Sequence, residues 1–334
     1  MYSVTNNRGF IPQSEQFEDR DMVGEDIKAY KIIHNKDFAY NPARINVGSI
    51  AKYNGSKPCM ISSLYVCFKA ANGIDEDWLM HLLRSPKIQY YYNINGEGGV
   101  RIYLFYPNFA RIRTSFPTIA EQRKIANLLS LLDARITTQN KIIEDLKKLK
   151  SAISKKLLCN DKWTTYKIQD IAEIGRGRVI SSVEIEKQRH PLYPVYSSQT
   201  SNDGIMGYLD NYMFDGEYIT WTTDGANAGT VFYRNGKFNC TNVCGTLKIH
   251  LQFDCHFVSL VLQQATQKYV SSNLANPKLM NNTMASIKIR MPDMETQKRL
   301  SKVFQTLDSR LLVHQCTYEM YLREKQYLLN QMFI

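Results

Sequence analysis

The sequence has no feature of a membrane protein, a secreted protein or a disulfide-rich protein. No apolar run among its 334 residues approaches the roughly 18 residues that a membrane-spanning helix needs. No signal peptide opens the chain. The seven cysteines are odd in number and lack the spacing of a disulfide framework. We therefore expect reduced thiols in a cytoplasmic protein.

Catalytic signatures are also absent from the sequence. The chain contains no phosphate-binding loop of the Walker type. Residues 276–279 (Asn-Pro-Lys-Leu) differ from the Asn-Pro-Pro-Tyr type of methyltransferase motif. The clustered carboxylates that a nuclease would need do not stand out either. The sequence therefore favours a binding protein over an enzyme and predicts no cofactor bound by this chain.

One cluster of metal-binding residue types needs a separate interpretation. It consists of Cys240, Cys244, His250, Cys255 and His256. Their spacing fits no standard zinc finger, and the first part of the segment covers a predicted strand pair. We therefore expect buried thiols and a surface histidine here, with no metal.

The chain is strongly basic and rich in tyrosine. Its formal net charge is +11, and it contains 21 tyrosines. An excess of positive charge favours a polyanionic partner, with nucleic acid first and an anionic membrane second.

One stretch of the chain occurs twice. Residues 117–158 and 292–333 align without a gap, and each copy opens with Pro-x-x-x-x-Gln and continues to Leu-Asp-x-Arg. The matched positions include Pro117 with Pro292, Gln122 with Gln297, Leu132 with Leu307, Asp133 with Asp308 and Arg135 with Arg310.

Each copy predicts one long helix. A proline and acidic residues at the start are helix-start signals, and apolar residues then recur at alternating spacings of four and three. That spacing is typical of a coiled-coil seam. A helix of this kind would be about 60 Å long and needs a partner along its narrow apolar stripe. We expect the two copies to pair as an antiparallel coiled coil.

Polar residues interrupt both seams at matching places. Gln139 corresponds to His314, and Lys150 corresponds to Lys325. In one permitted register Gln139 lies opposite Lys325 and Lys150 lies opposite His314, so that polar residues meet and fix the register. In the alternative, both lysines extend to solvent.

The two segments outside the long helices predict β-rich globules, and the fold class is therefore α+β. The predicted domains are 1–116 (first globule), 117–158 (first long helix), 162–290 (second globule) and 292–333 (second long helix). In the first globule we expect strands at 29–33, 45–53, 60–69 and 100–106 and a helix at 75–92. In the second we expect strands at 193–196, 218–222, 230–233, 244–250 and 287–290 and a helix at 256–270.

The globules are alike in layout but not in sequence. Tyr2–Gly9 can be aligned with Tyr196–Gly204. The counterpart of Trp163–Val195 would then precede Met1, and we expect the first globule to lack its N-terminal part. Such a truncation could leave that globule unstable or unable to recognise its target.

This order of globule, long helix, globule and long helix resembles the specificity subunit of type I restriction–modification systems. The resemblance rests on the two helix openings, Phe116-Pro117 to Gln122 and Met291-Pro292 to Gln297, and on Lys162-Trp163 at the start of the second globule. It implies that the globules are target recognition domains, each reading one half of a bipartite sequence in double-stranded DNA. It implies that the helices act as spacers and dock methyltransferase subunits, two in number.

The same resemblance implies that this chain does no chemistry itself. Its partner subunits would methylate adenine with S-adenosylmethionine. Restriction and translocation subunits would use ATP and magnesium.

The candidate DNA-binding residues lie in turns that are rich in basic, amide and hydroxyl groups. Arginine can pair with guanine, asparagine or glutamine with adenine, and hydroxyls with bases or phosphates. In the first globule the candidates are Asn6, Asn7, Arg8, Asn41, Arg44, Lys52 and Arg101. In the second they are Arg176, Arg178, Ser197, Ser198, Gln199, Thr200, Asn202, Thr222, Thr223, Asn227 and Arg234. The alternative is ordinary turn chemistry, since such residues dominate turns anyway.

Two other functions fit parts of the pattern. A coiled-coil scaffold with protein-binding globules would bind neither a specific DNA sequence nor a methyltransferase. A stand-alone DNA enzyme would require catalytic carboxylates that the sequence does not display.

Overall fold

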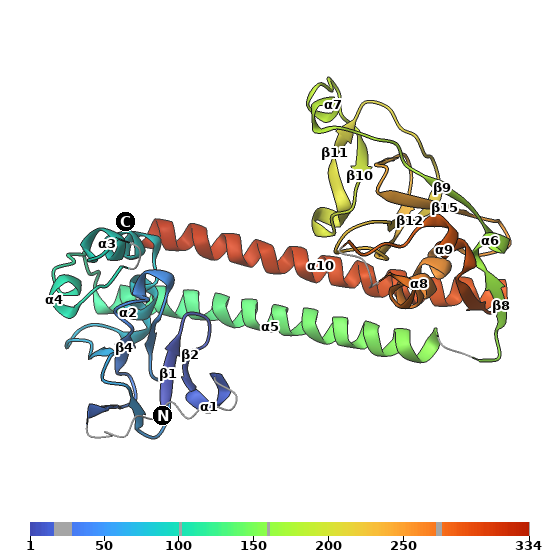
Figure 1. Cartoon of the computed structure of the whole chain (residues 1–334). Coiled ribbons are helices and arrows are strands. Elements are labelled where there is room, and N and C mark those ends of the chain that lie inside the picture. Colours follow the sequence, from blue (N-terminus) through green and yellow to red (C-terminus); the bar gives the residue numbers. More distant parts are fainter. Residues whose placement is uncertain (17–28, 100–101, 159–160, 272–275, 334) are drawn as a thin grey trace. The chain divides into compact units, whose positions relative to one another are not determined.

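The computed structural model describes residues 1–16, 29–99, 102–158, 161–271 and 276–333 (Figure 1). By its internal contacts the chain divides into two compact units. Unit 1 combines Met1–Ile142 with His314–Ile334, and unit 2 is Ile143–Val313. Each unit contains a globule of strands and short helices together with part of both long helices. The fold class is α+β, as predicted.

The two repeated stretches form the two long helices. Helix α5 spans Ile119–Leu157 and helix α10 spans Met294–Met332, with 39 residues each. The carboxylate of Glu121 accepts hydrogen bonds from the backbone N–H and the hydroxyl of Thr118, at 2.9 and 2.7 Å. At the start of α10 the roles are reversed, because Asp293 precedes the helix and its carboxylate accepts a hydrogen bond from the backbone N–H of Thr296 at 2.9 Å. These caps satisfy the free N–H groups of the first turn.

The long helices pack antiparallel within each unit. In unit 1 Lys325 of α10 forms an ion pair with Asp133 of α5. In unit 2 Lys150 of α5 forms an ion pair with Asp308 of α10. Since Lys150 corresponds to Lys325 and Asp133 to Asp308 in the repeat, the two ion pairs are equivalent.

The predicted pairing of polar seam residues is wrong. Nε2 of Gln139 lies 2.6 Å from Nδ1 of His314 and donates to its carbonyl oxygen at 3.1 Å, so the two equivalent residues meet each other. The lysines contact the aspartates of the Leu-Asp-x-Arg motifs instead of Gln139 and His314. The reason is charge, because a half-buried ammonium is compensated better by a carboxylate than by a neutral amide or imidazole.

Reversing one of these seam charges should destabilise unit 2. In Asp308→Lys two ammonium groups would meet, and we expect the free energy of unfolding to fall by about 1–2 kcal/mol. The expected effect is smaller than for a fully buried pair, because both side chains are partly exposed and solvent screens their charges. The double variant Lys150→Asp with Asp308→Lys restores an ion pair and should recover most of the loss in urea unfolding. The exposed pair Glu319 and Arg323 gives the control, since Glu319→Lys should change stability by less than about 0.5 kcal/mol. A double variant no more stable than the single one would contradict this expectation.

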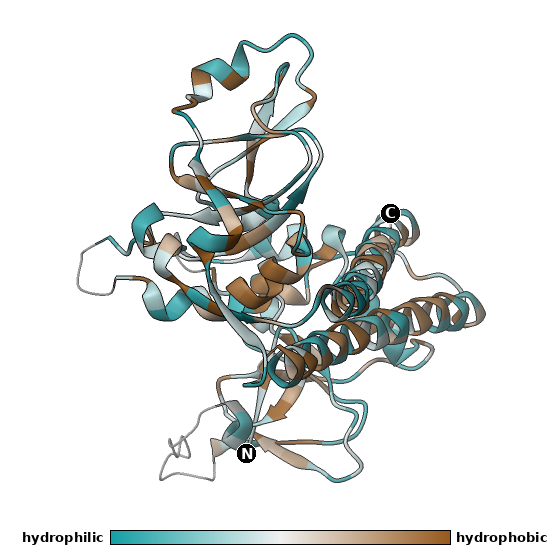
Figure 2. Ribbon diagram, turned by 90° about the vertical axis from the view of Figure 1, so that its right-hand side faces the viewer, coloured by the Kyte–Doolittle hydropathy of each residue, from teal (hydrophilic) through white to brown (hydrophobic). Residues whose placement is uncertain are grey.

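The apolar seam is formed largely as predicted. Its buried members are Leu129, Leu132, Ile143, Leu300, Phe304 and Leu311. Leu157 is an exception, because it is exposed at the end of α5 while Leu158 enters the core of unit 2. The ribbons of both helices alternate between hydrophobic and hydrophilic segments along their length (Figure 2). This alternation is expected of helices with one apolar stripe.

The first sheets of the two globules share a three-stranded arrangement, to which unit 1 adds a fourth strand. In unit 1 it comprises β1 (Tyr2–Thr5), β2 (Gly9–Pro12), β6 (Cys59–Ile61) and β3 (Lys31–Ile33). In unit 2 it comprises β10 (Tyr193–Tyr196), β11 (Ile205–Leu209) and β14 (Asn239–Cys240). In each sheet an antiparallel hairpin pairs in parallel with a later strand. Tyr2 lies opposite Ile61, and Tyr196 lies opposite Cys240. The predicted alignment of Tyr2 with Tyr196 is shifted, because Tyr2 begins β1 whereas Tyr196 ends β10, where it pairs with the first residue of β11 as Thr5 pairs with the first residue of β2.

The second sheet is likewise shared. In unit 1, β4 (Phe38–Tyr40) lies between β5 (Ile50–Lys52) and β7 (Val66–Phe68). In unit 2, β12 (Glu217–Thr222) lies between β13 (Val231–Asn235) and β15 (Cys244–Ile249), and β9 (Ala172–Arg176) pairs with β15. A separate pair in unit 2 joins β8 (Thr164–Lys167) to β16 (Lys288–Met291). The expected likeness of the globules therefore holds at the level of strand pairing.

Short helices complete the globules. Those of unit 1 are α1 (Gln13–Gln16), α2 (Glu76–Leu83), α3 (Pro86–Asn95), α4 (Tyr106–Phe109) and the 3-10 turn η2 (Ile45–Val47). Those of unit 2 are α6 (Ile168–Ile171), α7 (Ser182–Glu186), α8 (Cys255–Ala265), α9 (Asn281–Ser286) and the 3-10 turns η3 (Ser201–Gly204) and η4 (Thr266–Tyr269).

Four predicted elements of the first globule differ in the structure. The strand predicted at 60–69 is two strands, β6 and β7, which lie in different sheets. The helix predicted at 75–92 is two helices, because Pro86 lacks an N–H and starts α3 with Ser85 as its cap. The strand predicted at 45–53 begins with η2. In the strand predicted at 100–106, Tyr103 forms an isolated bridge with Glu97, and Tyr106 already starts α4. Val100 and Arg101 lie outside the described residues.

Each globule packs against the long helices of its own unit through a buried core. In unit 1 residues of α2 and α3 form one cluster with Ala126, Leu129, Leu329 and Phe333. In unit 2 residues of α8 form one cluster with Leu300 and Phe304. Among the described helices, none combines the length and the apolar character that crossing a membrane would require.

Candidate nucleic-acid interface

Three loops of the second globule meet and bring most of its predicted DNA-binding residues together. They are the turn after β9 (residues 176–178), the β10–β11 loop (197–204) and the β12–β13 loop (222–230). Nδ2 of Asn227 donates to the carbonyl oxygen of Ser198 at 3.3 Å. The guanidinium of Arg176 donates to Oγ1 of Thr223 at 2.9 Å. These two bonds link all three loops.

The accessible side chains of this loop cluster include both cations of the Gly-Arg-Gly-Arg turn. Arg176 lies 3.4 Å from Oδ2 of Asp224, whose other oxygen is 3.4 Å from Nζ of Lys278. Arg178 contacts both carboxylate oxygens of Glu184. Since these carboxylates hold the cations in defined places, contact with a phosphate would require an exchange of partners. Thr200 and Asn202 are also exposed.

Four further candidates of the second globule stabilise the loops. Ser197 accepts a hydrogen bond from the hydroxyl of Thr241 at 3.1 Å, and Gln199 donates to the carbonyl oxygen of Ile205. Ser198 and Asn227 form the bond between loops. All four are partly buried. Their hydrogen bonds shape the loop cluster, and their remaining exposed atoms are available at its surface.

Three candidates are buried in the structure, and their predicted contact with DNA stays a prediction. Thr222, Thr223 and Arg234 are 1%, 0% and 4% exposed. The guanidinium carbon of Arg234 lies 3.6 Å from the ring centre of Tyr196 and 4.4 Å from that of Phe232. An arginine between two rings, with an ion pair to Asp203 at 2.6 Å, is held inside the globule.

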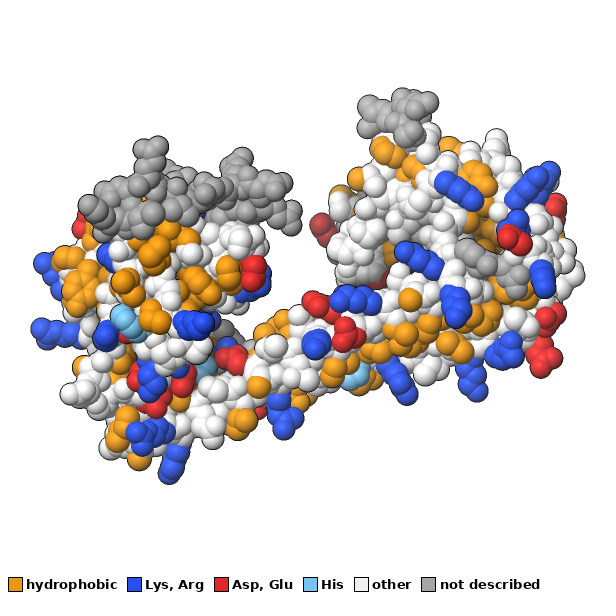
Figure 3. Space-filling model, turned by 90° about the horizontal axis from the view of Figure 1, so that it is seen from below, with side chains coloured by type: hydrophobic (Ala, Val, Ile, Leu, Met, Phe, Trp, Pro, Cys, Tyr) orange, Lys and Arg blue, Asp and Glu red, His pale blue; other side chains and the backbone are white. Residues whose placement is uncertain are grey.

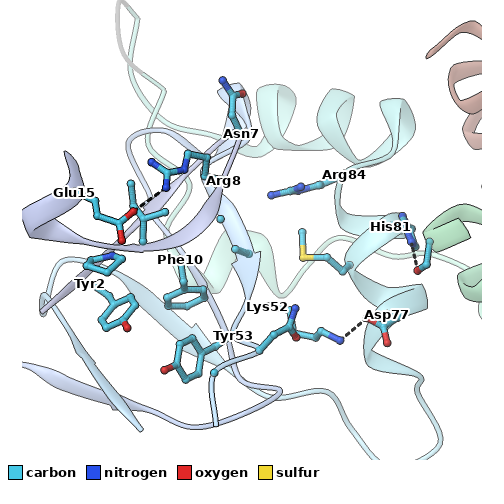
Figure 4. A pocket seen from close by; sticks show the side chains of 18 residues that line it. Tyr2, Asn7, Arg8, Phe10, Glu15, Lys52, Tyr53, Asp77, His81 and Arg84 are labelled. Atoms are coloured by element: carbon cyan, nitrogen blue, oxygen red, sulfur yellow. Dashed lines mark hydrogen bonds and ion pairs between the residues drawn. The ribbon is translucent and has the colours of Figure 1, made fainter. Parts of the chain in front are cut away.

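In unit 1 three predicted residues line one groove of about 780 Å³. Figure 4 shows Asn7 and Arg8 of the β1–β2 turn and Lys52 of β5, with helix α2 on the opposite side. Asn6 is exposed in the same turn, whereas Arg44 and the half-buried Asn41 lie outside the groove lining. Arg101 lies outside the described residues, so its predicted role stays a prediction.

Helix α2 contributes residues to this groove that sequence reasoning missed. Asp77, His81 and Arg84 line it from one face of the helix. Their spacings of four and three place them on one face, and this periodicity could have identified them. Lys52 forms an ion pair with Asp77, and the guanidinium of Arg84 donates to the carbonyl oxygen of Ile50 at 2.9 Å.

The groove combines cations with an aromatic wall. Arg8 forms an ion pair with Glu15 at 2.7 Å and stays exposed. The ring of Tyr53 packs edge-on against Tyr2 and Phe10, with centroid distances of 6.0 and 5.2 Å. Burial lowers the pKa of His81, so this imidazole is neutral near pH 7. The lining is therefore suited to polar and anionic groups.

Unit 2 has a smaller groove of about 390 Å³ at the equivalent place. Gln305 lines it where Ser130 lines the groove of unit 1, and these residues correspond in the repeat. Its other polar residues include Asp203, Gln263 and Asp308, with Lys150 as the cation. Equivalent grooves with different linings are what two recognition domains for different sequences would need.

The cysteine and histidine cluster is largely buried. Cys240, Cys244 and Cys255 are buried, as predicted. Burial raises the pKa of Cys255 to about 12, so its thiol stays protonated. His256 is buried too, whereas the sequence predicts a histidine at the surface for this cluster. Its Nδ1 lies 3.2 Å from the hydroxyl of Ser301. Over the described ranges no three histidine, cysteine or acidic side chains are grouped to hold a metal ion.

On the face of each unit that Figure 3 shows, positive charge is not gathered into one patch. Lysine and arginine side chains are scattered there, with acidic side chains among them.

Comparisons with known proteins agree on one family. The family model for the type I restriction modification DNA specificity domain matches residues 160–317. A type I specificity subunit of Mycoplasma pneumoniae is 38% identical over 231 residues, which cover 67% of this chain and 96% of that protein. The specificity subunit of the type I restriction enzyme MpnII from the same organism is 39% identical over 178 residues, covering 52% of this chain and 53% of that protein.

A solved structure shares the fold. The crystal structure of the S subunit of a type I restriction–modification system from M. genitalium matches with a TM-score of 0.70 at 16% identity. The match covers 90% of this chain and 84% of that chain. With a relative that is 38% identical over nearly its whole length, the chain belongs to the specificity subunits of type I restriction–modification systems.

Proposed function

We propose that this chain selects a bipartite DNA target, with one half read by each globule, for partner subunits that carry out the chemistry. Its family membership carries the proposal. The shared strand topology of the globules supports two equivalent DNA-reading modules. Their different loops and grooves support two different half-sites.

In unit 2 we assign DNA contact to the exposed side chains of the loop cluster. Arg176 and Arg178 suit phosphates or guanine, and Asn202 suits adenine. In unit 1 we assign it to the rim of the groove, where Arg8 and Arg84 are exposed. The half-buried Lys52 would support the site through its ion pair with Asp77.

We propose further that the long helices dock two copies of a methyltransferase subunit. The repeat keeps matching residues exposed on the two helices. Leu128 and Val303 correspond and are 45% and 40% exposed, and Arg135 and Arg310 correspond and are exposed. Two equivalent apolar and cationic surfaces suit two copies of one partner.

The proposed complex divides the chemistry among its subunits. Methylation of adenine would use S-adenosylmethionine held by the methyltransferase subunits. Restriction, where retained, would use ATP and magnesium in translocating nuclease subunits. The whole assembly would work in the cytoplasm, where its DNA lies.

Co-expression of the chain with its methyltransferase subunit, followed by genome-wide mapping of methylated adenines, tests the proposal. We expect a stable complex and a two-part motif with a fixed gap. Asn202→Ala should relax only the half read by unit 2, and Arg84→Ala should weaken only the half read by unit 1. No complex at all would favour a protein-binding scaffold, and a complex without methylation would indicate a defective allele.

A further inference from the structure

Each long helix carries one buried glutamine that contacts the globule of its own unit. Gln122 and Gln297 correspond in the repeat and are 2% and 1% exposed. Oε1 of Gln122 accepts a hydrogen bond from the backbone N–H of Asp75 at 2.8 Å. Oε1 of Gln297 accepts one from the backbone N–H of Asp254 at 2.9 Å. The same bond is therefore made twice, in two globules whose sequences differ.

The two aspartates are the N-caps of α2 and α8. Their side chains accept from the N–H groups of Trp78 and Phe257, at 3.0 and 2.7 Å. In a capping box, a glutamate or glutamine at that third helical position returns a bond to the N–H of the cap residue. Here the third position is an aromatic core residue, 1% exposed for Trp78 and 0% for Phe257, and it cannot return the bond. The glutamine of the long helix supplies it instead.

The other end of each glutamine holds the start of its own helix. Nε2 of Gln122 donates to the carbonyl oxygen of Pro117 at 2.9 Å, and Nε2 of Gln297 donates to that of Pro292 at 2.8 Å. A side-chain amide can fill both roles, because its oxygen accepts and its nitrogen donates. Each glutamine therefore ties the start of a globule helix to the start of a long helix, which gives a reason why the glutamine occurs in both copies of the repeat.

We propose that Gln122 and Gln297 are positioning residues that fix the angle of each recognition globule on its long helix, and thereby the gap between DNA half-sites that the complex accepts. A small rotation at this joint moves the far loops of a globule more than the joint itself. Because a gap can be measured only if the chain reads two half-sites, this role rests on the proposed function.

The test compares DNA duplexes that carry the mapped motif with its native gap or with a gap changed by one base pair. In complex with the methyltransferase subunit, Gln297→Met and Gln122→Met should each lower the preference for the native gap by about tenfold. A change of that size corresponds to the loss of one or two buried hydrogen bonds. Gln297→Glu keeps the acceptor but buries a carboxylate and sets one of its oxygens against the carbonyl oxygen of Pro292, so it should give a loss at least as large. Gln315→Met, at an exposed glutamine of the same helix, is the matched control and should keep the native preference.

Hydrogen exchange of the free chain gives a second measurement that does not depend on DNA. The backbone N–H of Asp254 should exchange about tenfold faster in Gln297→Met than in the native chain. An unchanged gap preference in assembled methionine variants would overturn the positioning role, and so would unchanged exchange at Asp254. If the native complex prefers no two-part sequence, the proposed function fails, while the exchange rates still show whether the glutamine holds the joint.

Discussion

Replacing Arg234 with methionine is expected to lower the free energy of unfolding of unit 2 by about 3 kcal/mol and to abolish the proposed recognition of a half-site by this unit. The guanidinium lies between two rings and donates to both the carboxylate and the carbonyl oxygen of Asp203, at 2.6 and 2.7 Å. Asn202 and Asp203 adopt left-handed φ angles of 49° and 53°. That conformation is uncommon outside glycine and needs such support.

Thermal unfolding and binding to duplexes with one half-site altered would measure the two effects. Arg234→Lys keeps the charge but lacks the planar guanidinium group that stacks between the rings and donates two hydrogen bonds, so it should recover only part of the stability. Arg189→Met, at an exposed arginine of the same globule, should change neither quantity. Native affinity for the half-site of unit 2 in Arg234→Met would show that the arginine does not shape the loop.

Local patterns in the sequence sufficed to predict the framework of this fold. The seam spacing predicts two long helices and their antiparallel pairing, because a narrow apolar stripe can be buried only against a similar one. Several strands of the second globule, such as β10 and β12, lie where β-rich runs between turns predict them. Helix periodicity and strand-forming runs depend on residues that are close in the sequence, so they can be recognised in one sequence alone.

The differences between prediction and structure arise where distant segments decide the outcome. Arg234 is buried because Tyr196 and Phe232 enclose it, and no local pattern announces that pairing. The seam register failed because polar residues were matched with each other, while the lysines reach the aspartates of the neighbouring helix. The break between α2 and α3 is different, since Pro86 signals it within the sequence itself.

The candidate site was predicted in its loops but only partly in its residues. Turn composition located the loop cluster of unit 2, because glycine, asparagine and serine mark the ends of strands whether or not they bind DNA. It could not separate the exposed Asn202 from the buried Thr223, since both lie in polar turns. Burial depends on which turn is covered by another, and that is a property of the folded globule.

Replacing Gly177 with valine should disrupt the proposed recognition surface of unit 2 altogether. A Cβ atom at Gly177 would lie 2.2 Å from the carbonyl oxygen of Cys240 and 2.3 Å from that of Thr241. These are backbone atoms that cannot turn aside, so the two chain segments must separate. The N–H of Arg178, which donates to the carbonyl oxygen of Cys240 at 3.1 Å, would lose its partner. We expect a loss of about 3 kcal/mol or more.

Two alanine variants separate the effect of the steric clash at Gly177 from a general effect of replacing a glycine. Gly177→Ala should already weaken binding to the half-site of unit 2 by at least about tenfold, because its single Cβ meets the same two carbonyl oxygens. Gly99→Ala is the matched control, since a Cβ there meets nothing within 4 Å. Duplexes altered in either half-site would locate the loss. If Gly177→Ala bound both half-sites with native affinity, the prediction would be wrong. Recognition would then not depend on the close packing of the turn that carries Arg176 and Arg178 against Cys240. Weakening confined to the half-site of unit 2 would instead place that turn at the DNA.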